Sequence, residues 1–217
     1  VVLHEGKLLT VSRGSQTRTV SAVEAFSTAS ESSPCDELLI ADDKVVVLGF
    51  RPRAGALEVG VFHIDAQGIL RRQHTFWFRS ERDYASRLIG HHLVLYLPVA
   101  ALSGNAMNFP TAREAPGEAW TRLGNTESIY AGLQRGAVFH TIADCNLERA
   151  HLDCVTRSVL AAPAPGHFGG RDAVYLWTAD HEANTESSVL YRLPLLGGAP
   201  GAIRVQGALV DPQAFDE

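Results

Sequence analysis

The sequence predicts an all-β protein, and three observations carry that prediction. Apolar residues recur in short runs and in alternations of period two, without the spacing of amphipathic helices. Turn-forming stretches such as Asp42-Asp43, Arg53–Gly55 and Ala66–Gly68 separate these runs at regular intervals. The runs are rich in Val, Leu and aromatic residues, which strands favour. We therefore expect about fourteen strands over the 217 residues.

The expected strands form two groups on either side of an irregular segment around residues 104–125. The first group comprises Leu8–Val11, Thr19–Phe26, Glu37–Ile40, Val45–Phe50, Leu57–Ile64, Leu70–Phe78, Ala85–Ile89 and Leu93–Pro98. The second comprises Ser128–Leu133, Val138–Ala143, His151–Leu160, Ala173–Thr178, Ser188–Pro194 and Ala202–Ala208. Prolines, glycines and charged residues fill the segment between them, so we expect a surface insertion there with room for a short helical turn.

One local pattern recurs and favours a β-propeller over a sandwich. An apolar strand, a polar turn and a second apolar strand appear in DELLIADDKVVVLGF, ASRLIGHHLVLYLP and RDAVYLWTADHEANTESSVLYRLPL. Each resembles the inner hairpin of a blade, and repetition at roughly 45–50 residues is typical of propellers. We predict that residues 1–217 are part of a single β-propeller domain with blades of four-stranded antiparallel sheets. Strand number then implies three to four blades, an incomplete ring in this chain.

The same segments resemble a known family. The ordered features are the "DELL…D-K-VVV-G" hairpin, the "E-V-G-F-ID-G-LR" strand pair and "YASRLIG" between Asp36 and Pro98, followed by DAVYLWTADH and SSVLYRLPLLGGAPGAIRVQGALVDPQAFDE. Together they resemble the N-terminal half of the bacterial secreted β-propeller domain-containing proteins. This resemblance implies a propeller fold and export from the cytoplasm, and it carries no catalytic signature.

The three cysteines predict one disulfide. Cys145 and Cys154 lie in CNLERAHLDC, at a separation that lets them face each other across a hairpin, whereas two free buried thiols are the alternative. Closing this loop would stabilise the fold by roughly 2.5–3 kcal/mol. A disulfide indicates an extracytoplasmic location: secreted, periplasmic or cell-surface. Cys35 is then either buried or paired with other chain.

Charge and motifs argue against several partners and cofactors. The net charge is −5 and no basic stripe exists, so we expect no nucleic-acid partner. No apolar run approaches the roughly 18 residues of a transmembrane segment. The histidine pair His91-His92 falls at a predicted turn, where neighbouring side chains diverge, and no metal or cofactor motif accompanies it. We expect no cofactor and no metal.

Three arginines are the candidate contact residues. Arg79, Arg82 and Arg87 fall within the segment that most resembles the family, and Arg87 belongs to the strand that opens with YASRLIG. We expect Arg87 to tie neighbouring blades through its guanidinium, with binding of an anionic ligand as the alternative role for the group.

The functional hypothesis is a binding or protein-interaction scaffold and not an enzyme. Its partner would be another protein chain or the remainder of the same propeller. The alternative is a hydrolase or lyase with acidic and histidine side chains facing the central channel. No Gly-x-Ser-x-Gly elbow is present to support a serine hydrolase.

Overall fold

The chain is built of β-sheets throughout the residues that the structure describes. A computed structural model describes residues 1–4, 6–12, 18–26, 36–133, 137–164, 166–179 and 187–207. These residues hold strands β1 to β20 and one 3-10 turn, η1 (Thr126–Ser128), and no α-helix. The all-β class that the sequence predicts is confirmed.

The strands are arranged in four sheets, numbered here in chain order, and one short ribbon. Sheet 1 has the order β1 (Val2–His4), β2 (Lys7–Ser12), β3 (Arg18–Glu24). Sheet 2 has the order β13 (Thr121–Arg122), β12 (Thr111–Arg113), β7 (Leu70–Arg79), β6 (Ala56–Ile64), β5 (Lys44–Arg51), β4 (Glu37–Ala41). Sheet 3 has the order β14 (Ile129–Ala131), β16 (Cys154–Ala161), β15 (Val138–Asn146), β9 (His92–Ala100), β8 (Ala85–Ile89). Sheet 4 has the order β17 (Gly166–Gly169), β18 (Ala173–Ala179), β19 (Ser187–Pro194), β20 (Gly201–Gln206), and the ribbon pairs β10 (Leu102–Ser103) with β11 (Ala106–Met107).

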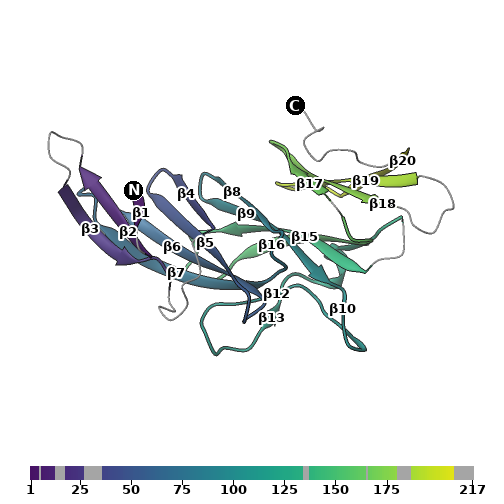
Figure 1. Cartoon of the computed structure of the whole chain (residues 1–217), viewed down its shortest axis with the longest axis horizontal. Helices are drawn as coiled ribbons and strands as arrows, with labels where there is room; N and C mark the ends of the chain where they lie inside the picture. The colour runs from purple at the N-terminus through teal and green to yellow at the C-terminus, as the bar shows by residue number, and fades with distance from the viewer. Residues whose placement is uncertain are drawn as a thin grey trace.

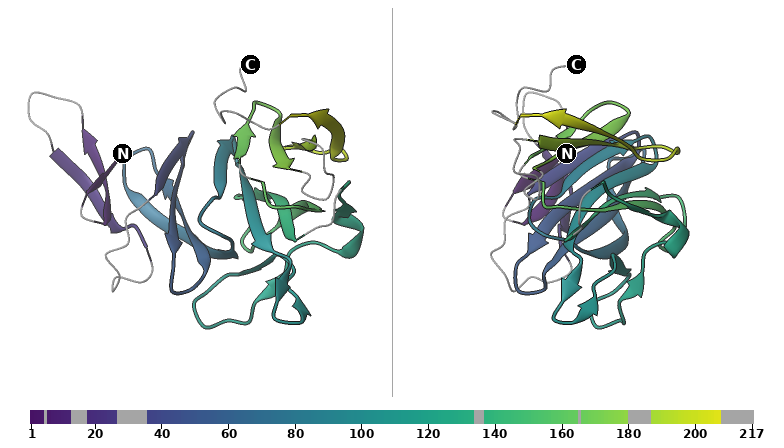
Figure 2. Two further views of the ribbon diagram at one scale, coloured as in Figure 1. Left: turned by 45° about the vertical axis from the view of Figure 1, so that its right-hand side comes forward. Right: turned by 90° about the vertical axis from the view of Figure 1, so that its right-hand side faces the viewer.

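The four sheets follow one another across the molecule in chain order (Figures 1 and 2). A separate apolar cluster fills each of the three spaces between successive sheets. The largest lies between sheets 2 and 3 and includes Leu48, Val59, Phe78, Leu95 and Leu97. Among the described residues the sheets form an open series and no closed ring.

The central strands are apolar on both faces because each sheet packs against two neighbours. In β5, Val45 and Val47 face sheet 1, whereas Val46 and Leu48 face sheet 3, as the period of two requires. All four side chains are completely buried. A continuous apolar run such as KVVVLGFR is therefore the expected sequence of a strand between two other sheets.

Two glycines of sheet 2 allow a close approach of sheet 1. A Cβ atom at Gly49 would lie 2.7 Å from the Phe26 ring, and one at Gly60 would lie 2.9 Å from the Ala25 carbonyl oxygen. Beside them the Arg51 Nε donates to the Glu58 carboxylate at 2.9 Å, and both side chains are buried. The residues at the end of β3 therefore pack against a face of sheet 2 on which only glycines leave enough space.

The irregular segment at residues 104–125 contains strands that the sequence analysis did not expect. β12 pairs with β7 and β13 pairs with β12, so the segment extends sheet 2 by two strands. Ala112 is completely buried and belongs to the core between sheets 2 and 3. Further along, η1 precedes β14, which pairs in parallel with β16.

Some expected strands are shorter in the structure than the sequence indicated. Ser128–Leu133 reduces to β14, and His151–Leu160 begins only at Cys154.

In the described part of the chain, no helix has the length and hydrophobicity needed to cross a bilayer.

Candidate functional site

A small cleft lies between sheets 3 and 4, where β8 meets the end of β17. Its volume is about 90 Å³. It is lined by Ala85, Ser86, Arg87, Val94, Tyr96, Gly169, Gly170, Val174 and Leu195. Pockets for whole small molecules typically measure about 300–1,000 Å³, so this cleft has room only for a small group.

Strand β8 is linked to sheets on both of its sides. The Ser86 hydroxyl donates to the Glu37 carboxylate on β4 of sheet 2. The next residue, Arg87, points the other way, and its Nη1 donates to the Gly170 carbonyl oxygen of sheet 4 at 2.6 Å. The hydrogen bond from a guanidinium is charge-assisted and hence among the stronger kinds. Arg87 therefore joins sheets 3 and 4 at the mouth of the cleft.

A buried tyrosine and histidine form the inner wall of this region. The Tyr96 hydroxyl and the His140 Nδ1 are 2.8 Å apart, and the His140 Nε2 is 2.9 Å from the Ala162 carbonyl oxygen. Because a carbonyl can only accept, Nε2 carries the proton, and Nδ1 of the neutral ring accepts from the tyrosine. Burial lowers the pKa of His140 below its usual value, an effect opposed by the Ala162 hydrogen bond, and so favours this neutral form.

His167, on β17 of sheet 4, packs against Tyr96 of this pair. Its ring centroid is 4.9 Å from that of Tyr96 in a tilted arrangement. Burial lowers the pKa of His167, although the negative charge of Asp83 opposes the shift. The pKa of Tyr96 is raised, first by burial and then by the charges of Glu81 and Asp83. All three rings are thus held neutral near pH 7.

These protonation states limit what the cleft can do chemically. Both ring nitrogens of His140 have partners and the side chain is 1% exposed, so it has no free atom to accept a proton from a substrate. The raised pKa of Tyr96 keeps its phenol protonated, and its proton is donated to His140. The group is arranged for rigid polar packing between two sheets, whereas Arg87 supplies the positive charge at the surface.

The three arginines singled out from the sequence lie in different surroundings. Arg87 contacts Gly170 across sheets 3 and 4. Arg79, at the end of β7 in sheet 2, places its guanidinium carbon 4.7 Å from the centre of the Trp120 ring. Arg82 is exposed in the segment between β7 and β8. The structure does not gather them around one ligand position.

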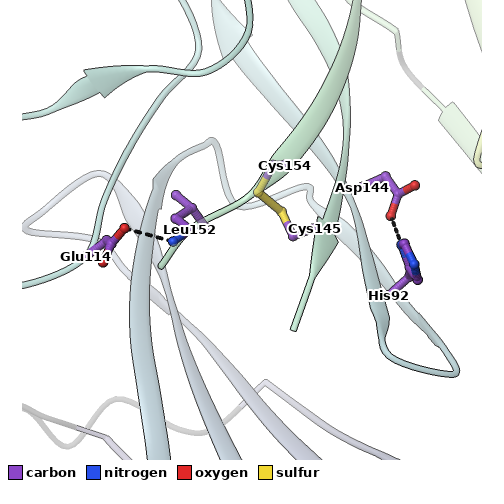
Figure 3. The surroundings of a disulfide bond; sticks show 6 residues. All are labelled: His92, Glu114, Asp144, Cys145, Leu152 and Cys154. Atoms are coloured by element: carbon purple, nitrogen blue, oxygen red, sulfur yellow. Dashed lines mark hydrogen bonds and ion pairs between the residues drawn. A yellow bond between two sulfur atoms is a disulfide. The ribbon is translucent and has the colours of Figure 1, made fainter. Parts of the chain in front are cut away.

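The predicted cysteine pair lies at the other large interface, between sheets 2 and 3. Cys145 on β15 and Cys154 on β16 are directly opposite in register, and their sulfur atoms are 2.05 Å apart, the distance of a disulfide bond (Figure 3). Nearby, the Leu152 amide donates to Glu114 at 2.8 Å, which holds the β15–β16 connection against the segment before β13 (Figure 3). Cys35 lies outside the described residues.

The histidine pair has separate carboxylate partners. The His92 Nδ1 lies 2.7 Å from the Asp144 Oδ1, a contact drawn in Figure 3, and the His91 Nε2 lies 3.6 Å from the Glu148 Oε1. Among the residues that the structure describes, no three His, Cys, Asp or Glu side chains come together as a metal site would require.

Sequence reasoning did not anticipate two of the residue pairs that the structure brings together. Tyr96 and His140 are 44 positions apart, and Trp77 and Arg113 meet only because β12 pairs with β7. No local motif signals such pairs. The sequence signal for the second pair is only that an arginine and a tryptophan lie close together twice, as Trp77 with Arg79 and as Arg113 with Trp120.

Comparisons with known proteins find no relative: no family model, no curated protein and no solved structure matches this chain. The family resemblance described above therefore stays a prediction.

Proposed function

We propose that this chain is part of an extracytoplasmic β-propeller that serves as a binding or protein-interaction scaffold. The observation that carries the proposal is the serial packing of antiparallel sheets in chain order. β4 to β7, β8 with β9, β15 and β16, and β17 to β20 each run from first to last strand across one sheet. Neighbouring first strands β4 and β8 are linked by the Ser86–Glu37 hydrogen bond. Blades of a propeller are related in the same way, with first strands toward a common axis.

The partner we propose is a further β-sheet that covers the second face of sheet 4. One face of sheet 4 packs on sheet 3 through Val174, Leu176 and Val189. By the alternation of strands, Leu190 lies on the opposite face, in register with Trp177 and with Ile203, which is 57% exposed. Sheets 2 and 3 are each covered by apolar packing on both faces, so continuity of the series favours a sheet as the occupant. It belongs either to the remainder of the same propeller or to another chain.

The disulfide supports the proposed location. A Cys145–Cys154 bond would persist in an oxidising compartment, whereas cytosolic thiols are kept reduced. The hydrolase or lyase alternative receives no support from the cleft, because His140 already uses both ring nitrogens.

Site-specific photo-crosslinking of the exported protein would test the scaffold. A photoreactive phenylalanine at Ile203 would report on the second face of sheet 4, and one at Arg149, whose side chain is 62% exposed, serves as the control. We expect position 203 to crosslink to an identified β-strand segment. Added mass would indicate a second chain, and an unchanged mass would indicate the same chain. Equal crosslinking yields at positions 203 and 149, in a protein that is a monodisperse monomer in solution, would refute the proposed partner.

A further inference from the structure

Arginine and tryptophan side chains are interleaved on the face of sheet 2 that packs on sheet 1, starting at the margin of that contact. Strand register places Glu58, Trp77 and Arg113 in one row across β6, β7 and β12. The neighbouring row holds Arg51, Ala56 and Arg79. Thr111 lies two residues from Arg113 on the same face, and the guanidinium groups of Arg79 and Arg113 both lie over the Trp120 ring. The Arg–Trp patch is defined as Arg51, Trp77, Arg79, Thr111, Arg113 and Trp120.

The aromatic rings hold the guanidinium groups in fixed positions. The Arg113 guanidinium carbon lies 5.2 Å from the centre of the Trp77 ring and 4.6 Å from that of Trp120. The Arg79 guanidinium carbon lies over Trp120, 4.7 Å from the ring centre, and that of Arg51 lies over Phe26 at 4.0 Å. A guanidinium group above an aromatic ring is attracted to the negative face of that ring, and this contact favours a defined position for the side chain. Arg79 and Arg113, which are partly exposed, are consequently preorganised hydrogen-bond donors at the surface of the patch.

The positive charge of the patch is poorly compensated. Glu58 accepts from the Arg51 Nε. Within the part of the chain that the structure describes, neither Arg79 nor Arg113 forms an ion pair with a carboxylate. The remainder of the protein has the opposite sign, since the net charge is −5. The patch is a local concentration of cations on an acidic protein.

Buried donors without acceptors also gather here. Five buried polar atoms of the patch have no hydrogen-bond partner among the described residues: Arg51 Nη1, Arg51 Nη2, Trp77 Nε1, Thr111 Oγ1 and Arg113 Nε. Trp77 is 4% exposed and Arg51 is 3% exposed, so water contact does not satisfy them fully. A buried polar group without a partner is costly, so these donors favour an acceptor at the margin of the patch, where the partly exposed Arg79 and Arg113 reach the surface.

We infer that the Arg–Trp patch binds the oxyanions of an acidic polysaccharide. Arginine edges match carboxylate and sulfate oxygens, which sugar acids and sulfated sugars both present along a linear chain. A single-stranded nucleic acid fits less well, because it stacks its bases on open aromatic faces and these rings are covered by guanidinium groups. An acidic peptide added as a strand would find an edge strand, β13, of only two residues. The inference holds whether or not the sheets belong to a propeller.

Binding of defined polymers to the full chain would test the inference. The probes are polygalacturonate as the carboxylate form and heparin as the sulfate form, compared with neutral dextran, poly-L-glutamate and single-stranded DNA. We expect one of the acidic polysaccharides to bind most tightly, with affinity that falls as salt is raised. The stronger of the two identifies the oxyanion. Absence of binding to both at low salt, or equal binding of poly-L-glutamate or DNA, would overturn the inference.

Matched variants assign the binding to the patch. Arg113→Gln and Arg79→Gln are each expected to weaken binding by about tenfold or more, the loss expected for hydrogen bonds to a charged group. Arg113→Lys keeps the positive charge but loses the planar guanidinium that can donate two parallel hydrogen bonds. It is therefore expected to bind more tightly than Arg113→Gln but less tightly than the unaltered chain. Arg192→Gln removes the same charge from sheet 4, where Arg192 pairs with Asp172, and is expected to bind like the unaltered chain.

Folding of each variant is checked by circular dichroism and thermal unfolding. Should Arg113→Gln fail to fold, Arg79→Gln decides alone. Arg79→Gln and Arg192→Gln variants that bind equally well would place the site elsewhere and overturn the assignment.

Discussion

The two interfaces of sheet 3 differ in chemistry although one strand serves both. On β9, Leu93, Leu95 and Leu97 pack toward sheet 2, whereas Val94 and Tyr96 pack toward sheet 4. The first interface is an apolar cluster with a disulfide at its end. The second carries hydroxyl and imidazole groups in its core and a cleft at its margin. A strand with alternating faces can thus present dry packing to one neighbour and a titratable, polar surface to the other.

The largest expected loss of stability comes from shortening a buried side chain in the apolar interface between sheets 2 and 3. Leu95 is completely buried, so Leu95→Ala should lower the free energy of unfolding by about 3–5 kcal/mol, since a cavity remains. Leu195→Ala in the cleft wall should cost about half as much, because its loss enlarges a space that already exists. Denaturant unfolding measures both, and equal losses would mean that the two interfaces are packed alike.

Removing the disulfide should have the next largest effect. Cys145→Ala with Cys154→Ala should lower the free energy of unfolding by roughly 2.5–3 kcal/mol through the freed loop in the unfolded chain. Unaltered protein in reductant should unfold at a similar denaturant concentration. Insensitivity of the unaltered protein to reductant would contradict the bond.

The sequence predicts the parts of the fold that depend on local alternation. Val45–Phe50 and Leu70–Phe78 are close to β5 and β7, because apolar runs between turn residues specify strands without reference to distant chain. β12 and β13 were missed because two or three residues carry too little pattern, and their pairing with β7 is set by tertiary contacts.

The same distinction applies to the sites. The pairing of Cys145 with Cys154 follows from a short hairpin and was readable from spacing. The contact of Tyr96 with His140 depends on β9 pairing with β15 across the intervening segment, and nothing in the residues around either position predicts it. Nor does the sequence indicate that Arg79 and Arg113 share the ring of Trp120.

A smaller loss is expected from the polar interface when its hydroxyl is removed. Tyr96→Phe keeps the ring but leaves the buried Nδ1 of His140 without a donor, which should lower the free energy of unfolding by about 1–3 kcal/mol. Tyr84→Phe is the control, because its hydroxyl contacts Asp36 at 3.3 Å in a more exposed setting and should cost less. Equal stability of Tyr96→Phe and the unaltered chain would show that the pair contributes nothing net.

The smallest effect, and the one that separates the interfaces most clearly, is the pH dependence of stability. Burial lowers the pKa values of His140 and His167 in the folded chain, whereas in the unfolded chain they are near 6.5. Between the folded and unfolded pKa values the unfolded chain binds more protons, so the free energy of unfolding rises with pH there. Their contribution is complete above about pH 6.5 and is lost as the pH falls toward the folded pKa values.

Urea unfolding from pH 5 to pH 8 would measure this slope. His140→Gln keeps one donor and one acceptor but does not titrate, so the slope should become shallower, and His167→Gln should reduce it further. His74 faces the margin of the interface between sheets 2 and 3, and its pKa is also lowered by burial, but the side chain is only half-buried. Solvent screening weakens such a contribution, so His74→Gln should change the slope less than His140→Gln. A pH slope of the free energy of unfolding that depends on His74 and not on His140 would contradict this assignment. The histidine whose protonation opposes folding would then lie at the interface between sheets 2 and 3 and not at the interface between sheets 3 and 4.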